Sequence, residues 1–367
     1  MLIQKFDVNE KERNQRTIRN YGLDLLKIFA MINIINLHIN LKTNFTKINP
    51  QSLKLHHVFR LEIFSYWPVD AFGLISGIVG NNKYKFNNII YLWFIYAFYS
   101  IIISIILFYK SKINSMDFIL SFFPLGIKRN WYVNAYIFMY YFLPFVINSI
   151  DSINRILYRK IVFHFFVIYS IYYTIIKNII KNTNFNYING GYSSLWLLIL
   201  YIVGGYLRRF CINKYRVSKY LFLLIYLLSS FISSEYIIYN IRKYNYKHFI
   251  FMSYTSPTII IQALSLIFFF SKLKLNNKYI IKAIRFFYPL NFSVNIIHSR
   301  FFFSQVKLSL ELFKFINVLS PTCLFFKIYG ISIVIYFICT FIDYLRLLLF
   351  KLFQIRIICN LIEKIIF

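Results

Sequence analysis

Ten apolar runs divide this chain of 367 residues, and most of them have the length that a helix needs to cross a lipid bilayer. A spanning helix takes about 20 mostly apolar residues, and its backbone groups must pair with each other because lipid offers no partners. The sequence therefore predicts an all-α integral membrane protein with about ten transmembrane helices in one bundle. The predicted spans are residues 21–41, 66–82, 88–109, 131–149, 159–177, 193–208, 219–239, 248–271, 287–305 and 324–347.

The composition also favours a membrane protein. Hydrophobic residues make up 59% of the chain and charged residues 15%, whereas about a quarter of a soluble domain is charged. The formal net charge of +30 is of a kind that nucleic-acid-binding proteins carry. Here, however, the cations lie in short loops between apolar runs, and no soluble basic domain is predicted. We therefore expect a lipid bilayer as a partner, and no nucleic acid.

The positions of Lys and Arg predict how the chain is oriented. Cytoplasmic loops carry an excess of these residues, and the loops on the side of the N-terminus hold more of them than the others. We expect a multi-pass protein of the cell (plasma or inner) membrane with both termini in the cytoplasm. Residues 1–20 would be a basic cytoplasmic tail, residues 21–347 the ten-helix membrane domain, and residues 348–367 a basic amphipathic tail.

The first apolar run carries two polar residues that deserve a functional interpretation. Lys27 and His38 are eleven residues apart, which is about three helical turns, so both project from one helix face about 16 Å apart along the axis. Ionisable residues inside a membrane are costly and usually face a protein interior or a wet cavity. The alternative is that His38 only makes a hydrogen bond within the bundle and Lys27 extends to the inner interface.

Five motifs follow one another along residues 20–300. In this order they resemble acyltransferase family 3, the multi-helix membrane O-acyltransferases that modify bacterial surface polysaccharides and lipids. The motifs are Tyr21–Met31 with Leu37-His38, Val69–Gly77, Trp131–Tyr136, Gly190–Trp196 with Tyr201–Arg208, and Ser256-Pro257 with Leu290–His298.

The resemblance implies an acyl transfer across the membrane. Family members take an acyl group, usually acetyl, from coenzyme A on the cytoplasmic side and pass it to a hydroxyl of a cell-surface polysaccharide or glycolipid. Acetyl-CoA would then be a substrate, with no bound cofactor. The family's first helix carries an arginine, ten residues, and an essential histidine, positions that Lys27 and His38 occupy here. A histidine can take the proton of a hydroxyl group as general base, which is the role expected for His38.

Three further candidates belong to the second predicted span and the loop after it, with Asp70 towards the outer face and Lys83 and Lys85 on the cytoplasmic side. Lys83 and Lys85 resemble a basic pair that meets the CoA phosphates, although a loop obeying the positive-inside rule would explain them equally well. Asp70 could orient an imidazole, as carboxylates do for catalytic histidines, or it could cap the helix that it begins. The neighbouring Ser76-Gly77 predicts a close crossing of two helices between small residues.

The remaining candidates lie towards the outer side. His298 takes the histidine position of the family's Tyr-Leu-Ile-His, although Asn295 replaces the aromatic residue. It would hold the site by a hydrogen bond across the bundle, or act directly in catalysis. Trp131 and Tyr136 could stack on an acceptor sugar, but they are also typical of the aromatic belt at a membrane interface.

Other site classes find little support in the sequence. The remaining histidines and the four cysteines show no metal-ligand spacing, so no metal site is predicted. A rival hypothesis is a transporter or flippase that moves a lipid-linked sugar or another anionic substrate without a covalent step. Transporters often contain two paired halves with interrupted helices, and we find no such internal pairing.

Overall fold

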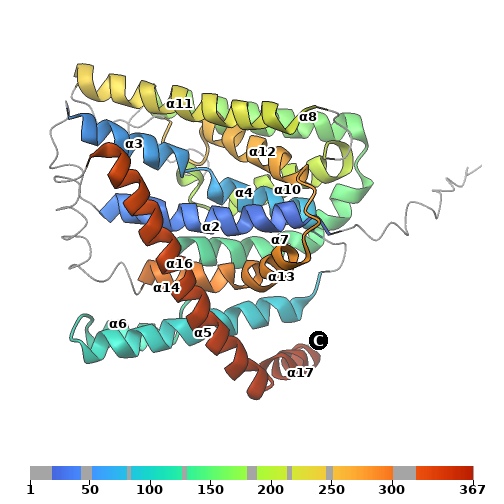
Figure 1. The fold of residues 1–367 in the computed structure, drawn as a ribbon. Helices are drawn as coiled ribbons and strands as arrows, with labels where there is room; N and C mark the ends of the chain where they lie inside the picture. Colours follow the sequence, from blue (N-terminus) through green and yellow to red (C-terminus); the bar gives the residue numbers. More distant parts are fainter. Residues whose placement is uncertain are drawn as a thin grey trace, which may run out of the picture.

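All secondary-structure elements of the computed structural model are helices in the part of the chain that it describes (Figure 1). It describes residues 19–42, 52–80, 84–125, 130–179, 188–212, 217–244, 251–300 and 320–366, and none of these lies in a strand. The helices are α2 (Tyr21–Lys42), α3 (Leu53–Phe64), α4 (Pro68–Val79), α5 (Phe86–Tyr109), α6 (Ser115–Leu120), α7 (Trp131–Ser152), α8 (Arg155–Phe166), η2 (Val167–Tyr172), α9 (Tyr173–Ile179), η4 (Asn189–Gly191), α10 (Ser194–Phe210), α11 (Lys219–Tyr244), α12 (Pro257–Ser271), α13 (Lys278–Phe287), η5 (Tyr288–Leu290), α14 (Asn291–Arg300), α16 (Pro321–Leu352) and α17 (Ile355–Ile366).

Seven helical segments of the described chain are long and apolar enough to cross a membrane. They are Tyr21–Asn40, Phe86–Tyr109, Trp131–Ser152, Arg155–Lys177, Lys219–Lys243, Lys278–Arg300 and Thr322–Leu352. These seven candidate spans indicate a multi-pass membrane protein.

The predicted count of about ten spans is not confirmed. Helices α4, α10 and α12 coincide with predicted spans to within a few residues or fill part of them, but they have only 12, 17 and 15 residues. Two of these helices begin later than predicted, and each begins at a proline. Pro68 and Pro257 occupy the first turns of α4 and α12, where a missing N–H group costs nothing.

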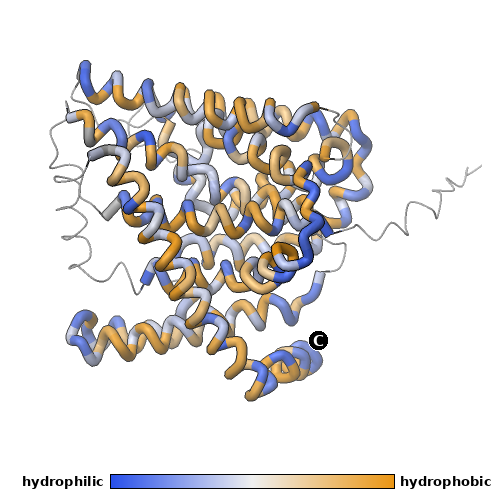
Figure 2. Tube along the Cα trace, in the orientation of Figure 1, coloured by the Kyte–Doolittle hydropathy of each residue, from blue (hydrophilic) through white to orange (hydrophobic). Residues whose placement is uncertain are grey.

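Helix α2 is the central element of the bundle (Figure 1). It contacts α4, α12, α13, α14 and α16. Its side chains Asn33, Asn36 and Asn40 are fully buried, whereas Phe231 and Ile232 on the peripheral α11 are more than half exposed. Apolar residues also cover much of the outer helices (Figure 2). Polar groups inside and apolar groups outside are the arrangement that a lipid surrounding favours.

Several helices begin or end at the side of the bundle where α2 begins (Figure 1), and Lys and Arg are frequent in the segments that join them. Hydrogen bonds tie these segments together: Asn20 Nδ2 donates to the carbonyl of Ser271 over 2.8 Å, and Lys272 Nζ donates to the carbonyl of Val217 over 2.9 Å. Arg208 and Arg209 lie in the last turn of α10, Lys219 begins α11, Lys272 follows α12 and Lys278 begins α13.

Candidate active site

Two histidines from distant parts of the chain meet inside the bundle. His38 lies near the end of α2 and His298 near the end of α14, with 260 residues between them. The distance between His38 Nδ1 and His298 Nε2 is 2.9 Å, and the ring centroids are 5.1 Å apart. His298 is fully buried and His38 is half-buried. The structure thus joins two residues that the sequence had placed in separate spans.

A third group fixes the protons of this pair. His298 Nδ1 lies 2.6 Å from the carbonyl oxygen of Val294, and a carbonyl oxygen can only accept a hydrogen bond. His298 Nδ1 therefore carries a proton, and in the neutral form of this ring Nε2 accepts from His38 Nδ1. This tautomer leaves the lone pair of the His38 ring on Nε2, which is what a general base requires.

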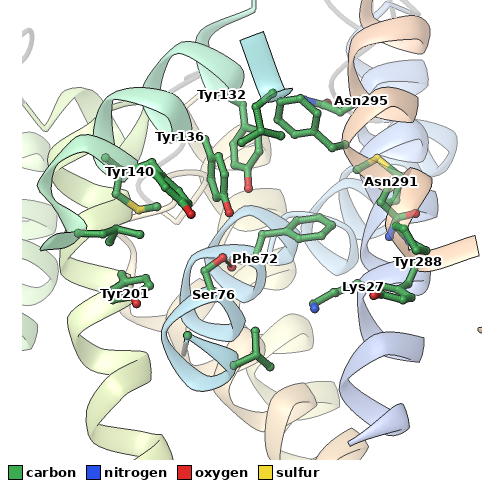
Figure 3. A pocket seen from close by; sticks show the side chains of 18 of the residues that line it. Lys27, Phe72, Ser76, Tyr132, Tyr136, Tyr140, Tyr201, Tyr288, Asn291 and Asn295 are labelled. Carbon is green, nitrogen blue, oxygen red and sulfur yellow. Dashed lines mark hydrogen bonds between the residues drawn. The ribbon is translucent and has the colours of Figure 1, made fainter. Parts of the chain in front are cut away.

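A cavity of about 410 Å³ lies between α2, α4, α7 and the η5–α14 segment (Figure 3). This volume is at the lower end of the range of ligand pockets, which is about 300–1,000 Å³. The wall is mostly apolar, with hydroxyl and amide groups and the Lys27 ammonium facing the space. Six tyrosines line it: Tyr84, Tyr132, Tyr136, Tyr140, Tyr201 and Tyr288.

Lys27 faces the cavity from the N-terminal half of α2 (Figure 3). Its Nζ lies 3.3 Å from Asp24 Oδ1 and 5.4 Å from the ring centroid of Tyr288. Arg19, just before α2, binds the same carboxylate at 2.7 Å and lies over the same ring. Burial by itself lowers the pKa of Arg19, but hydrogen bonds with Asp24 and Tyr288 outweigh it and raise this pKa. The cationic end of the cavity is thus held by one carboxylate.

Three tyrosines of α7 form one wall of the cavity. Tyr132, Tyr136 and Tyr140 follow each other at intervals of four residues, so their side chains share a helix face and extend into the space (Figure 3). Trp131 does not line the cavity. It stacks on Tyr254 with 5.8 Å between ring centroids and contacts Tyr192 at 4.7 Å. Of the two proposed acceptor-binding residues, the structure brings only Tyr136 to the cavity.

The cavity stops short of the histidine pair. Its lining reaches Met31 on α2 and Asn295 on α14, which precede His38 and His298 by seven and three residues. At 1.5 Å per residue, these separations are about 10 Å and about 5 Å along the helix axes. His38 and His298 are not among the lining residues. The space therefore leads from Lys27 towards the histidines without reaching them.

Asp70 contacts an indole instead of a histidine. The Nε1 of Trp196 on α10 donates to Asp70 Oδ1 over 2.9 Å, and the carboxylate is fully buried. Asp70 Oδ2 has no hydrogen-bond partner among the described residues. Within the described chain, the contact that the structure gives Asp70 thus belongs to neither of the two roles expected from the sequence.

The proposed phosphate-binding pair is described only in part. Lys83 lies outside the described residues, and Lys85 is exposed just before α5. Its neighbour Tyr84 lines the cavity and stacks on Tyr140 with 5.3 Å between ring centroids. Burial, followed by the proximity of Tyr140, raises the pKa of Tyr84 to about 12. Lys85 therefore lies next to a residue of the cavity wall.

No known relative was found. Comparisons with protein-family models, curated proteins and solved structures gave no match. The described part of the chain also holds no group of three or more His, Cys, Asp or Glu side chains that could bind a metal ion.

Sequence reasoning missed several partners in this site. The pairing of Lys27 with Asp24 could have been expected, because residues three apart on a helix are neighbours. The four-residue spacing of the α7 tyrosines was also visible in the sequence. The contact of Asp70 with Trp196 joins residues 126 apart, and no local pattern indicates it.

Proposed function

We propose that this protein is a membrane O-acyltransferase that transfers an acyl group, most simply acetyl, from coenzyme A to a hydroxyl of a cell-surface polysaccharide or glycolipid. The observation that supports this best is the contact between His38 and His298, because it leaves His38 in the tautomer of a general base. The motifs that resemble acyltransferase family 3 contain both residues.

The donor would enter from the end of the cavity that holds Lys27. The ammonium group would attract the CoA phosphates, together with Lys83 and Lys85, and the thioester would extend towards Asn295. The cavity is too small for a whole coenzyme A with its nucleotide, and it suits the narrow arm that carries the acyl group. The nucleotide would then remain at the mouth of the cavity.

The acceptor hydroxyl would approach His38 from the opposite side. His38 is half-buried although it does not line the cavity, so its accessible part faces other space. As the hydroxyl oxygen attacks the thioester carbon, His38 Nε2 takes its proton, and His298 keeps the ring oriented. Trp131, which does not line the donor cavity, is the proposed contact to the sugar ring, whereas Tyr136 lines the donor cavity. Asp70 would support the site through Trp196.

The proposed orientation places the cationic end of the bundle in the cytoplasm of the cell, with both termini on that side. The cations gathered at this end support it, because cytoplasmic loops are enriched in Lys and Arg. The short helices α4, α10 and α12 would complete a bundle of about ten membrane segments. Lys27 would then face the cytoplasmic donor, and His38 would lie towards the outer surface.

The test uses membranes of the native host, which contain the natural acceptor. Labelled acetyl-CoA is added, and the label is followed into polysaccharide and glycolipid. The His38→Ala variant should lose this transfer while keeping normal expression and membrane insertion. His164→Ala is the matched control, because His164 is exposed on α8. Transfer that survives in His38→Ala would remove the assignment, and a wild-type protein that never consumes acetyl-CoA would favour a transporter.

A further inference from the structure

Two asparagines line the cavity on the face of α14 that leads to His298. Asn291 and Asn295 are one turn apart, and His298 follows Asn295 by three residues, so the three side chains share one face. Asn291 is 4% exposed and Asn295 is 5% exposed, and both contribute to the cavity wall (Figure 3). A membrane helix therefore presents two buried amides to the proposed donor site.

The amide of Asn291 has a fixed orientation and an unused donor. The hydroxyl of Tyr336 on α16 donates to Asn291 Oδ1 over 2.9 Å. Its Nδ2 has no hydrogen-bond partner among the described residues. Buried N–H groups are normally paired, and leaving one unpaired is costly. An acceptor atom of a ligand at this wall would therefore be bound favourably.

The acyl group of a thioester brings one such acceptor, its carbonyl oxygen. Met31, Phe72 and Phe292 also line the cavity and suit the methyl group. Tyr132 contacts Phe72 and Tyr136 contacts Phe292, so their hydroxyl groups belong to the same wall. We propose that Asn291 and Asn295 bind the carbonyl oxygen of the acyl thioester, and that Asn295 stabilises the oxyanion formed during transfer. This inference rests on the proposed acyltransferase function.

The reaction step is balanced as follows. The acceptor oxygen forms a bond to the thioester carbon while its proton moves to His38 Nε2, and the carbonyl π electrons move to the oxygen facing Asn295. The amide N–H of Asn295 stabilises this negative charge, as oxyanion-hole donors do. When the carbonyl re-forms, the carbon–sulfur bond breaks, and the CoA sulfur leaves with the proton held by His38.

Binding of two CoA analogues to the purified protein tests the inference without an acceptor. In acetonyl-dethia-CoA a methylene replaces the sulfur and the carbonyl remains, whereas S-ethyl-CoA has no carbonyl. The wild-type protein should bind the ketone at least about tenfold more tightly than the thioether, as expected for a site built to hydrogen-bond its ligand. Asn291→Leu and Asn295→Leu should each reduce this preference by weakening binding of the ketone alone.

A further variant separates the effect of the amide N–H group from the effect of the side chain's size. Asn295→Asp keeps the size of the side chain but has no N–H donor, so it should also lose the preference. Its turnover should fall by about 10²–10³ in kcat with a smaller change in KM. The control is Asn148→Leu, because Asn148 lies exposed on α7, another cavity-lining helix. Its preference for the ketone should equal that of the wild type.

The outcomes distinguish this inference from the proposed function. If the wild-type protein binds both analogues equally, or the asparagine variants weaken both to the same extent, the amides do not bind the carbonyl and the inference is wrong. If the wild-type protein binds neither analogue and consumes no acetyl-CoA, the proposed function itself is overturned.

Discussion

His38 on α2 and His298 on α14 form a hydrogen bond of 2.9 Å between two imidazole rings, with the second ring tied to the carbonyl of Val294. These contacts define which nitrogen of each neutral ring carries the proton. His298 acts as an acceptor for His38, and it is buried too deeply to meet an acceptor sugar itself. In the proposed reaction it would therefore be a positioning residue, whose chemical requirement is an acceptor atom at the place of Nε2.

That requirement separates two substitutions of His298. Glutamine offers a carbonyl oxygen that can accept from His38 Nδ1, whereas leucine fills similar space and cannot. We expect His298→Leu to lower kcat for acetyl transfer by about 10–100-fold, the usual effect of removing a partner that orients a histidine. His298→Gln should recover a large part of the rate. Equal losses in both variants, measured with labelled acetyl-CoA in membranes, would rule out the acceptor role.

The sequence predicts where the helices of this protein lie better than it predicts how long they are. The apolar runs mark long helices such as α5 and α11, because continuous hydrophobicity of this length has few other uses. No long apolar run predicts α3, which covers residues 53–64 in a segment that the sequence predicts to be an outer loop. There Lys54, His56, His57, Arg60 and Glu62 interrupt the apolar residues, and packing against α11 and α16 completes the helix.

The candidate site shows the same division between local and distant information. The spacing of Lys27 and His38 predicts a shared helix face, and Lys27 does line the cavity. The contact between His38 and His298 could not be read from spacing, because it depends on how α2 and α14 pack. The sequence also cannot show that Trp131 packs against Tyr192 and Tyr254. These contacts depend on how the segments before α10 and α12 pack against the start of α7.

Lys27 should act mainly on donor binding. Its ammonium lies in the cavity beside Asp24, about three turns of α2 before His38. We expect Lys27→Met to raise KM for acetyl-CoA by about tenfold or more, the effect of losing one hydrogen bond to a charged group. Lys27→Arg keeps the charge and can bind phosphate with two hydrogen bonds, so its KM should stay near the wild-type value. Steady-state kinetics that show a loss of kcat alone in Lys27→Met would contradict this assignment.

A buried ion pair within α16 contacts α5 away from the cavity. The guanidinium of Arg346 donates to Asp343 through Nε and Nη2, both at 2.9 Å, and the hydroxyl of Tyr99 donates to the same carboxylate over 2.8 Å. Asp343 is fully buried and Arg346 is 4% exposed. Hydrogen bonds inside the protein therefore satisfy both charges. Removing either residue would leave the other charge buried without its opposite.

Removing one member of this pair should destabilise the protein more than removing both. Arg346→Met leaves a buried carboxylate without its cation, which typically costs about 3–5 kcal/mol, whereas an apolar replacement of a whole pair is often neutral. We expect a lower melting temperature for Arg346→Met in detergent, and a recovery in the double variant Asp343→Leu with Arg346→Met. A double variant less stable than Arg346→Met would show that the carboxylate is needed for its contact with Tyr99.

The crossing of α4 and α10 has no room for side chains at two glycines. A Cβ atom on Gly204 would collide with the carbonyl oxygen of Leu74 and lie 3.0 Å from the Cα of Gly77. A Cβ on Gly77 would meet the carbonyl oxygen of Tyr201. The close crossing that Ser76-Gly77 predicts is therefore confirmed, and it is made by backbone contact between two helices.

Gly204→Val should therefore disturb both stability and donor binding. Extra atoms must push α4 away from α10, and forcing side chains into a packed contact costs about 1–3 kcal/mol. Because α4 carries Phe72 and Ser76 of the cavity wall, its shift should also weaken binding of acetyl-CoA. The control is Gly330→Val on α16, where a Cβ would find no atom within 4 Å. Melting temperature and analogue binding should both fall for Gly204→Val alone, and equal melting of the two variants would show that the crossing can adjust.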